Sequence, residues 1–511
     1  MDPNTAGWVL IAALALPLVG AALMLLLPKD DEVRIKRFAV LVTGVAFALV
    51  AAMTAAFDYG RSGELQFVTD VAWIDAINAR FHLGIDGISL PLFFLSYLLP
   101  LLSAIYTTKH LPEPGKPKAF LGLMLLLQTG MAGTFVAFDL ILFFIFFELV
   151  LVPMFFMIGM WGGPRRDYAS VKFFLYTLFG SIFMLVSFLA VYFQSGLRSW
   201  DIVELSNASM IGSTTFQTWA FLGMFLGFAI KVPMWPFHTW LPDAHTEAPT
   251  VGSVLLAGVL LKIGTYGFIR IALPILPGGA ERFAPVIGVL AVIGIIYGSL
   301  CCLAQTDIKR LIAFSSVGHM GFVMLGIAAM NEAGIQAALF GNIAHGVITG
   351  MLFFLAGSLH ERYHTRDMHV IGGGMLMKIP RYGVLLTYVA VASLGLPGLA
   401  GFWGEFGAMW AAISPGFGLA DRYGGLYLAL VVFAAIGTVL TAGYFLWMLQ
   451  RVNLGRPTEK WAGAELDDVL RIEWVAWTPL LVLVLALGVF PRLVFGVQDA
   501  AVSVLLRTMG G

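Results

Sequence analysis

The chain has 511 residues, of which 59% are hydrophobic and 12% are charged, and its 30 basic residues balance its 30 acidic residues. Soluble globular domains carry about 25% charged residues, so the composition excludes an ordinary soluble domain and favours a protein whose solvent is lipid. A net charge of zero gives no reason to expect nucleic acid as a partner. Cys301 and Cys302 are adjacent in an apolar run, which indicates two core residues and no iron–sulfur cluster, metal site or disulfide framework.

Apolar runs long enough to cross roughly 30 Å of hydrocarbon recur along the whole chain. The first follows Asp2 rather than a basic region, so we expect a membrane helix that is not cleaved. These runs are too long for barrel strands, which predicts an all-α polytopic membrane protein. The fourteen predicted transmembrane helices are 6–28, 36–57, 87–108, 118–137, 139–160, 170–194, 215–236, 249–271, 283–304, 308–329, 332–359, 382–411, 424–450 and 474–495. A further interfacial helix is expected after Phe495, and 58–86 and 195–214 are the longest connections.

The basic residues predict the orientation of these helices. Connections 1–2, 3–4, 5–6, 9–10, 11–12 and 13–14 hold twenty of the 30 basic residues, whereas the termini and the opposite connections hold eight. Because loops rich in lysine and arginine stay in the cytoplasm, we expect both termini on the outer, periplasmic side of a bacterial-type plasma (inner) membrane. The cytoplasmic connection "LPDAHTEAPT" has no basic residue, and its Asp243 and His245, with His238 just before it, are secondary candidates for handling protons.

Six ionisable groups interrupt the predicted spans. Each costs at least about 2.5 kcal/mol at the centre of a bilayer, so such groups rarely face lipid and usually serve function. They are Glu148, Lys231, Lys262, His319, His345 and Glu405. For the two histidines, a helix–helix hydrogen bond is an equally good interpretation.

Two of these groups lie beside a broken helix. Pro233 and Pro236 interrupt the helix of Lys231, and Pro397, with three close glycines, interrupts the helix of Glu405. A break at membrane depth is tolerated only where it is buried in protein or faces water. A pair of broken helices in two halves of a chain is typical of transporters built from inverted repeats.

The spacing of the charges predicts such a repeat. His319 follows Glu148 by 171 positions, and Glu405 follows Lys231 by 174 positions. Because five helices is an odd number, a second copy enters the membrane from the opposite side. The predicted parts are helices 1–3 (1–117), the first inverted repeat of helices 4–8 (118–271), the second of helices 9–13 (283–450), and helix 14 with a tail (451–511). Burial disfavours a charged lysine and a carboxylate favours it, so a Lys231 that meets and loses Glu148 takes up and releases a proton.

Five blocks of the sequence carry a resemblance to a known family. They are "GIDGISLPLFFLSYLLPL", "WGGPRRDYASVKFFLYTLFGS", "KVPMWPFHTWLPDAHTEAPTVGSVLLAGVLLKIGTYG", "DIKRLIAFSSVGHMGFV" and "LPGLAGFWGEF". With these blocks the chain resembles the antiporter-like membrane subunits of respiratory complex I, the proton-pumping NADH:quinone oxidoreductase, in the branch called chain M or subunit 4. That family is related to the subunits of multisubunit cation/proton antiporters.

The resemblance implies a role for each buried group. It makes Glu148 the partner of Lys231, Lys262 the link between two half-channels, His319 and His345 members of a central hydrophilic axis, and Glu405 the exit residue. The implied activity is proton translocation, with no redox chemistry in this chain, driven by quinone reduction elsewhere in the complex. The implied partners are neighbouring membrane subunits, including other antiporter-like ones, and partner subunits that hold FMN, iron–sulfur clusters and quinone.

Two other interpretations compete with this one. A subunit of a multisubunit sodium/proton antiporter shares the pattern, although the resemblance implies lysine rather than Glu405 in that branch. A structural scaffold, in which the charges only lock helices together, belongs to a different class. The glycine run at 372–375 lacks the strand–helix context of a dinucleotide site. One departure from the repeat is that Lys262 has no charged counterpart near position 436.

Overall fold

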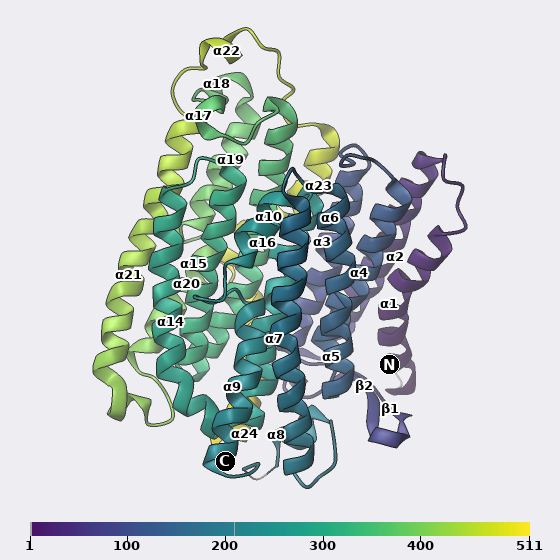
Figure 1. Ribbon diagram of the computed structural model, residues 1–511, viewed down its shortest axis with the longest axis vertical. Coiled ribbons are helices and arrows are strands. Elements are labelled where there is room, and N and C mark those ends of the chain that lie inside the picture. The colour runs from purple at the N-terminus through teal and green to yellow at the C-terminus, as the bar shows by residue number, and fades with distance from the viewer. Residues whose placement is uncertain (1–2, 209, 511) are drawn as a thin grey trace.

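The apolar runs form long, roughly parallel helices in the computed structural model, which describes residues 3–208 and 210–510 (Figure 1). Within that part of the chain, thirteen helices are long and apolar enough to cross a membrane. Twelve of them coincide with predicted spans, and the thirteenth is the helix expected near the C-terminus. The two remaining predicted spans, 215–236 and 382–411, are the ones in which the prolines predicted a break. The fold class predicted from the sequence is therefore confirmed.

The first half of the chain contains the N-terminal helices and the first broken helix. Its helices are α1 Pro3–Met24, α2 Glu32–Ala56, α3 Ser89–Thr107, α4 Pro117–Val136, α5 Leu140–Leu149, α6 Leu151–Trp161, α7 Arg166–Gln194, α8 Ile202–Ser206, α9 Thr214–Lys231, α10 Trp240–Glu247, α11 Thr250–Leu255, α12 Leu261–Gly267 and α13 Leu273–Ile275. Two π-helical segments, Leu256–Leu260 and Phe268–Ala272, join the last three into one span.

The second half also consists of long helices and one broken span. Its helices are α14 Pro277–Leu303, α15 Ile308–Ala328, α16 Glu332–Tyr363, α17 Met368–Ile371, α18 Met375–Lys378, α19 Pro380–Ser393, α20 Gly401–Ile413, α21 Leu419–Val452, α22 Glu459–Ala462, α23 Arg471–Val489 and α24 Arg492–Gly510. Both chain ends, α8 and the β-hairpin lie in the lower half of Figure 1, whereas α17, α18 and α22 lie at the upper end.

A β-hairpin stands where the sequence analysis predicted only a connection. Strands β1 Gln66–Ile74 and β2 Ala79–Ile85 pair antiparallel. The segment "QFVTDVAWI" is rich in β-branched and aromatic residues, which suit a half-exposed strand. The turn between the strands ends at Asn78, whose φ of 57° is one that asparagine tolerates well. The all-α prediction therefore missed one small sheet outside the membrane helices.

Both predicted helix breaks are present, and each follows from proline. Helix α9 ends at Lys231, two residues before Pro233, and the chain returns to a helix only at Trp240. The second break separates α19, which ends at Ser393, from α20. The expected cytoplasmic loop 241–250 was wrong: residues 241–247 belong to α10, which is almost wholly buried. A new helix forms there because the segment is buried in the bundle, and a helix pairs its buried backbone groups with one another.

Two helices in different halves begin in the same way at opposite ends of the bundle. Asp139 caps α5 and Asp307 caps α15, each accepting two backbone N–H groups. Asp139 also forms an isolated antiparallel bridge with Asp201, which caps α8, as Asp307 does with Asp367, which caps α17. In Figure 1, α8 lies at the lower end and α17 at the upper end. The two local motifs are thus alike but point in opposite directions.

The most buried helices form the centre of the bundle. The apolar window of α15 is 100% buried, and those of α16 and of the span 250–275 are each 94% buried, whereas that of α21 is 28% buried. Lipid-facing helices such as α21 therefore surround three central helices. Lys262, His319 and His345 are all carried by these three helices.

Candidate functional site

Lys231 is a buried basic residue at the C-terminal end of a broken helix. It is the last residue of α9, it is 1% exposed, and its Nζ has no hydrogen-bond partner among the described residues. The ammonium lies 4.7 Å from the centre of the Phe147 ring. Trp240 helps to end the helix, because its indole N–H donates to the freed carbonyl of Ile230 at 2.8 Å.

Glu148 directly follows Phe147 in the chain and lies at the end of α5. Its Oε1 is buried and, like the Nζ of Lys231, has no hydrogen-bond partner in the described structure. Pro153 accounts for the interruption between α5 and α6, because its ring blocks the carbonyl four residues earlier. The pair predicted from sequence is therefore close in space but is not in contact.

Helix α9 ends directly against the helix that carries Lys262. A side chain at Gly264 would place its Cβ 2.8 Å from the carbonyl oxygen of Phe228, one turn before Lys231. The absence of a side chain at this one position therefore lets the two backbones touch. This approach links the Lys231 region to the centre of the bundle.

Lys262 and His345 form the first contact on the central axis. Lys262 is fully buried, and its Nζ lies 2.6 Å from Nδ1 of His345 on α16. The same ammonium donates to the carbonyl of Ala257, which lies in the first π-helical segment. One proton is shared across the contact between Nζ and Nδ1, since one nitrogen must donate and the other must accept.

His319 and Glu405 form the second contact. Nδ1 of His319 lies 2.7 Å from Oε1 of Glu405, and its Nε2 lies 3.0 Å from the hydroxyl of Ser393. The His319 and His345 rings are 5.7 Å apart. A cavity of about 30 Å³, large enough for water, lies between the two histidines and Glu405. Four of the six predicted residues are therefore brought together in one row.

The three secondary candidates lie in α10 or in the break just before it. His245 is fully buried in α10, and its ring stacks on Phe353 at 4.6 Å. His238 lies in the break after α9 and packs against Tyr297. Asp243 accepts a hydrogen bond from Lys172 at 2.8 Å. His245 therefore touches α16, the helix that also carries His345.

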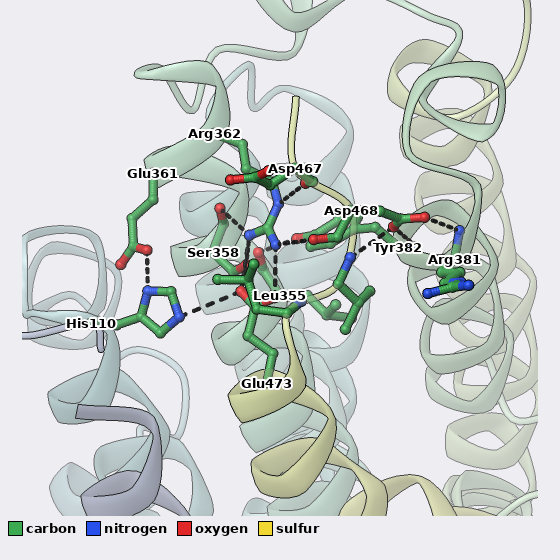
Figure 2. A network of polar contacts seen from close by, with 12 residues as sticks. His110, Leu355, Ser358, Glu361, Arg362, Arg381, Tyr382, Asp467, Asp468 and Glu473 are labelled. Atoms are coloured by element: carbon green, nitrogen blue, oxygen red, sulfur yellow. Dashed lines mark hydrogen bonds and ion pairs between the residues drawn. The ribbon is translucent and has the colours of Figure 1, made fainter. Parts of the chain in front are cut away.

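A polar network at the upper end surrounds Arg362, at the last turn of α16 (Figure 2). Its guanidinium donates to both carboxylate oxygens of Glu473, at 2.9 and 2.7 Å, and Glu473 is fully buried. Ser358 donates to Glu473 at 2.5 Å. His110, just after α3, contacts Glu361, and its other nitrogen is 3.6 Å from Glu473.

The segment before α23 completes this network. Arg362 donates to the carbonyls of Asp467, at 2.7 Å, and Asp468, at 2.9 Å. Asp468 in turn accepts the first backbone N–H groups of α19, from Arg381 and Tyr382 (Figure 2). A cavity of about 430 Å³ opens beside His110 and reaches buried Lys309. The network therefore holds α3, α16, α19 and α23 together at the mouth of a polar cavity.

Sequence reasoning missed two buried polar contacts, one beside the row and one away from it. Asn342 accepts a hydrogen bond from Thr265 at 3.0 Å beside Lys262. A second group missed is the ion pair of Arg270 with Asp86, which are distant in sequence. The sequence held one indication of Arg270: it follows Lys262 by eight residues, a spacing that places both on about the same face of a helix. In the described part of the chain, no three His, Cys, Asp or Glu residues are grouped to hold a metal ion.

Comparison with known proteins gives consistent matches over almost the whole chain. A family model described as "NADH:quinone oxidoreductase/Mrp antiporter, TM" matches residues 137–420. NADH-quinone oxidoreductase subunit M of Rhodobacter capsulatus is 39% identical over 508 residues, covering 96% of this chain and 95% of that protein. NAD(P)H-quinone oxidoreductase chain 4 1 of Nostoc sp. is 39% identical over 498 residues, covering 96% and 90%.

Solved structures match the fold as well. A chain of respiratory complex I from Thermus thermophilus with bound NADH has a TM-score of 0.86 and 29% identity, covering 98% of this chain and 100% of that chain. A chain of the Mrp complex from Dietzia sp. has a TM-score of 0.84 and 20% identity, covering 100% of both. The second likeness is one of fold alone.

Proposed function

The chain belongs to the NADH:quinone oxidoreductase/Mrp antiporter membrane family, and we propose that it translocates protons as a membrane subunit of NADH:quinone oxidoreductase. It is thus part of a translocase. The single observation that carries the proposal is the row Lys262, His345, His319 and Glu405, buried in the three most central helices and the second broken helix. Buried titratable groups in contact, with room for water between them, allow a proton to pass from one to the next.

Lys231 and Glu148 act as the loading step of this path. An unpaired buried ammonium is costly, so Lys231 is driven either to lose its proton or to gain a counter-charge. When Glu148 approaches, Lys231 keeps its proton; when the carboxylate withdraws, as in this structure, Lys231 passes the proton towards Lys262. The close approach of α9 and α12 at Gly264 holds the helices that carry the two lysines side by side.

The inverted repeat and the orientation are part of the same proposal. Helices 4–8 (118–271) form one copy and helices 9–13 (283–450) the other, flanked by 1–117 and 451–511. The matching aspartate bridges at opposite ends of the bundle support this division. The excess of basic residues supports a cytoplasmic location for the upper end of Figure 1 and a periplasmic location for both termini.

The driving chemistry belongs to other chains of the complex. We propose that partner subunits hold the FMN, the iron–sulfur clusters and the quinone, and that this chain receives only a conformational or electrostatic signal. A role in a sodium/proton antiporter is the alternative function. The likeness to the Mrp chain supports only the fold, whereas the 39% identical relatives favour the oxidoreductase.

The test is Lys231→Ala in the whole complex, reconstituted in liposomes after assembly is checked on a native gel. NADH:quinone turnover and proton uptake are measured together. We expect turnover and uptake to fall together, because the path is obligately coupled. Lys29→Ala, at an exposed lysine, serves as the control and keeps both. Full turnover with a normal proton yield in an assembled Lys231→Ala complex contradicts the proposal and favours the scaffold interpretation.

A further inference from the structure

A second buried ion pair lies away from the relay, at the lower end of the span 250–275. One guanidinium nitrogen of Arg270 lies 2.6 and 2.5 Å from the two carboxylate oxygens of Asp86. Asp86 also accepts the backbone N–H groups of Ile88 and Ser89 at 3.0 Å, at the start of α3. The side chains of Arg270 and Asp86 are 10% and 5% exposed. The pair is therefore held firmly in one position.

The backbone is shaped to place Arg270 there. Arg270 is in the second π-helical segment, and Pro274 follows four residues later. The ring of Pro274 blocks the carbonyl of residue 270, which favours the wider turn. The guanidinium packs 5.1 Å from the Phe138 ring and 5.7 Å from the Tyr266 ring.

A cavity reaches this ion pair from the lower end of the bundle. Its volume is about 320 Å³, and both Arg270 and Asp86 line it, together with residues of α8 and α24. Its other polar lining residues include Glu64, Asn207 and Thr508. It is roomy and polar enough to hold water. Water that fills this cavity would therefore reach the ion pair.

Only a short stretch of helix separates this cavity from the relay. Lys262, Tyr266 and Arg270 follow one another at intervals of four, so they lie on one face of the span. Eight residues of helix rise about 12 Å. Tyr266 is fully buried between them, and its hydroxyl donates to the carbonyl of Phe135 at 2.9 Å. A proton on Lys262 is thus close to an escape route to the lower end.

We propose that Arg270 is an electrostatic barrier that stops protons from leaking between Lys262 and the outer face. The inference rests on the proposed function, because a barrier matters only if Lys262 carries protons. A guanidinium does not release its proton in proteins, so it cannot pass one on, and its fixed positive charge repels an approaching proton, as in other pores that exclude protons. Asp86 is a positioning residue that holds the guanidinium in place from the cavity side.

A purely structural ion pair makes a different prediction. If the pair only fastens the span to α3, then removing either charge leaves the other buried and unpaired, and both variants lose stability alike. Neither variant then changes proton permeability. A barrier, by contrast, depends on the sign of the charge, so loss of Arg270 and loss of Asp86 have unlike effects.

The experiment measures passive proton flux in proteoliposomes that contain the assembled complex, without NADH. A potassium diffusion potential drives the flux, and an enclosed pH-sensitive dye reports it. We expect Arg270→Gln to raise the flux about tenfold over the unmodified complex. Arg270→Lys, which keeps the charge, and Asp86→Asn, which keeps Arg270, stay within about twofold. Arg282→Gln, at an exposed arginine that contacts Thr218, is the matched control.

Two further variants keep the outcome decisive. Arg270→Met, which has similar length and no charge, replaces Arg270→Gln if the glutamine variant does not assemble. Lys262→Ala added to the leaky variant returns the flux to the original level if the leak passes through Lys262. An assembled Arg270 variant without charge whose flux is unchanged overturns the proposal, as does an equal leak in Asp86→Asn. Passive proton flux is measured without NADH turnover. Its result is therefore independent of the result of the coupled pumping test of Lys231.

Discussion

His319 and Glu405 are in hydrogen-bond contact across the second broken helix, with 2.7 Å between Nδ1 and Oε1. The predicted repeat aligns these groups with Glu148 and Lys231 of the first half, where Glu148 Oε1 and Lys231 Nζ have no hydrogen-bond partner among the described residues. One half of the chain therefore holds its acid–base pair closed while the other holds it open. If the two halves are copies, a proton that moves from one half to the other requires the two pairs to be in different states, one in contact and one separated.

The first prediction concerns Glu405→Gln. Glutamine keeps the shape of the side chain and can still accept from His319, but it carries no charge and cannot take up a proton at physiological pH. Proton transfer by a positioned side chain contributes about 10²–10⁴-fold to a rate. We therefore expect NADH:quinone turnover and proton uptake to fall at least about tenfold in the assembled complex. Glu459→Gln, at an exposed glutamate, serves as the control and remains normal.

The second prediction concerns Lys262→Arg. Arginine preserves the positive charge and the hydrogen-bonding capacity, but it does not deprotonate in proteins. If Lys262 passes on a proton, the arginine variant assembles and yet loses coupled proton uptake by at least about tenfold. If Lys262 only binds His345 and the carbonyl of Ala257, arginine largely substitutes for it. Lys29→Arg controls for the substitution itself, because Lys29 is exposed and lies outside the row.

The sequence predicts the parts of this site that depend on local pattern. Charges in apolar runs and prolines beside them were enough to locate Lys231, Glu405 and both broken helices. Contacts between distant segments were not predictable in this way. Asp86 and Arg270 are 184 positions apart, and His110 and Glu361 are 251 positions apart. Nothing near either residue in the chain indicates its partner, because the packing of whole helices brings them together.

The β-hairpin and α10 were missed for a different reason. Both are short elements within polar connections, where hydrophobic periodicity is weak. Helix α10 is ordered by packing against the bundle, and the strand preference of the short segment Gln66–Ile74 was overlooked beside the long apolar runs. The separation of Glu148 from Lys231 is likewise a property of one conformation, and no pattern in the sequence encodes which conformation is present.

The third prediction concerns the network of Figure 2. Glu473→Gln removes the only carboxylate that the Arg362 guanidinium contacts within the described residues. Breaking a buried ion pair by removing one partner costs about 3–5 kcal/mol, so we expect a clearly lower temperature for heat-induced loss of the complex on native gels. Ser358→Ala, which removes one neutral donor, costs about 1 kcal/mol. Asp31→Asn, in an exposed pair with Arg34, produces no measurable shift. Equal midpoints for Glu473→Gln and Asp31→Asn contradict the prediction.

The last prediction concerns acid and the His82–Asp201 pair, which lies outside the membrane helices. Burial raises the pKa of the Asp201 carboxyl, but hydrogen bonds from His82 and from the backbone N–H groups of Glu204 and Val203 lower it, and the net pKa is below the usual 3.8. A carboxyl whose pKa is lower in the folded state stabilises that state above its unfolded pKa, and this stabilisation is lost as the pH falls through the folded pKa. The effect is therefore confined to pH values below about 4, and it leaves stability at pH 5 to 7 unchanged. The Ile202 amide donates to the carbonyl of Phe138. Hydrogen exchange of the 196–207 peptide, corrected for the intrinsic rate at each pH, reports the protection of this amide. We expect that protection to fall below pH 4. Asp201→Asn keeps the helix cap but carries no charge, so its protection should be lower at pH 6 and change less with acid; a variant that follows the unmodified chain at every pH contradicts the assignment.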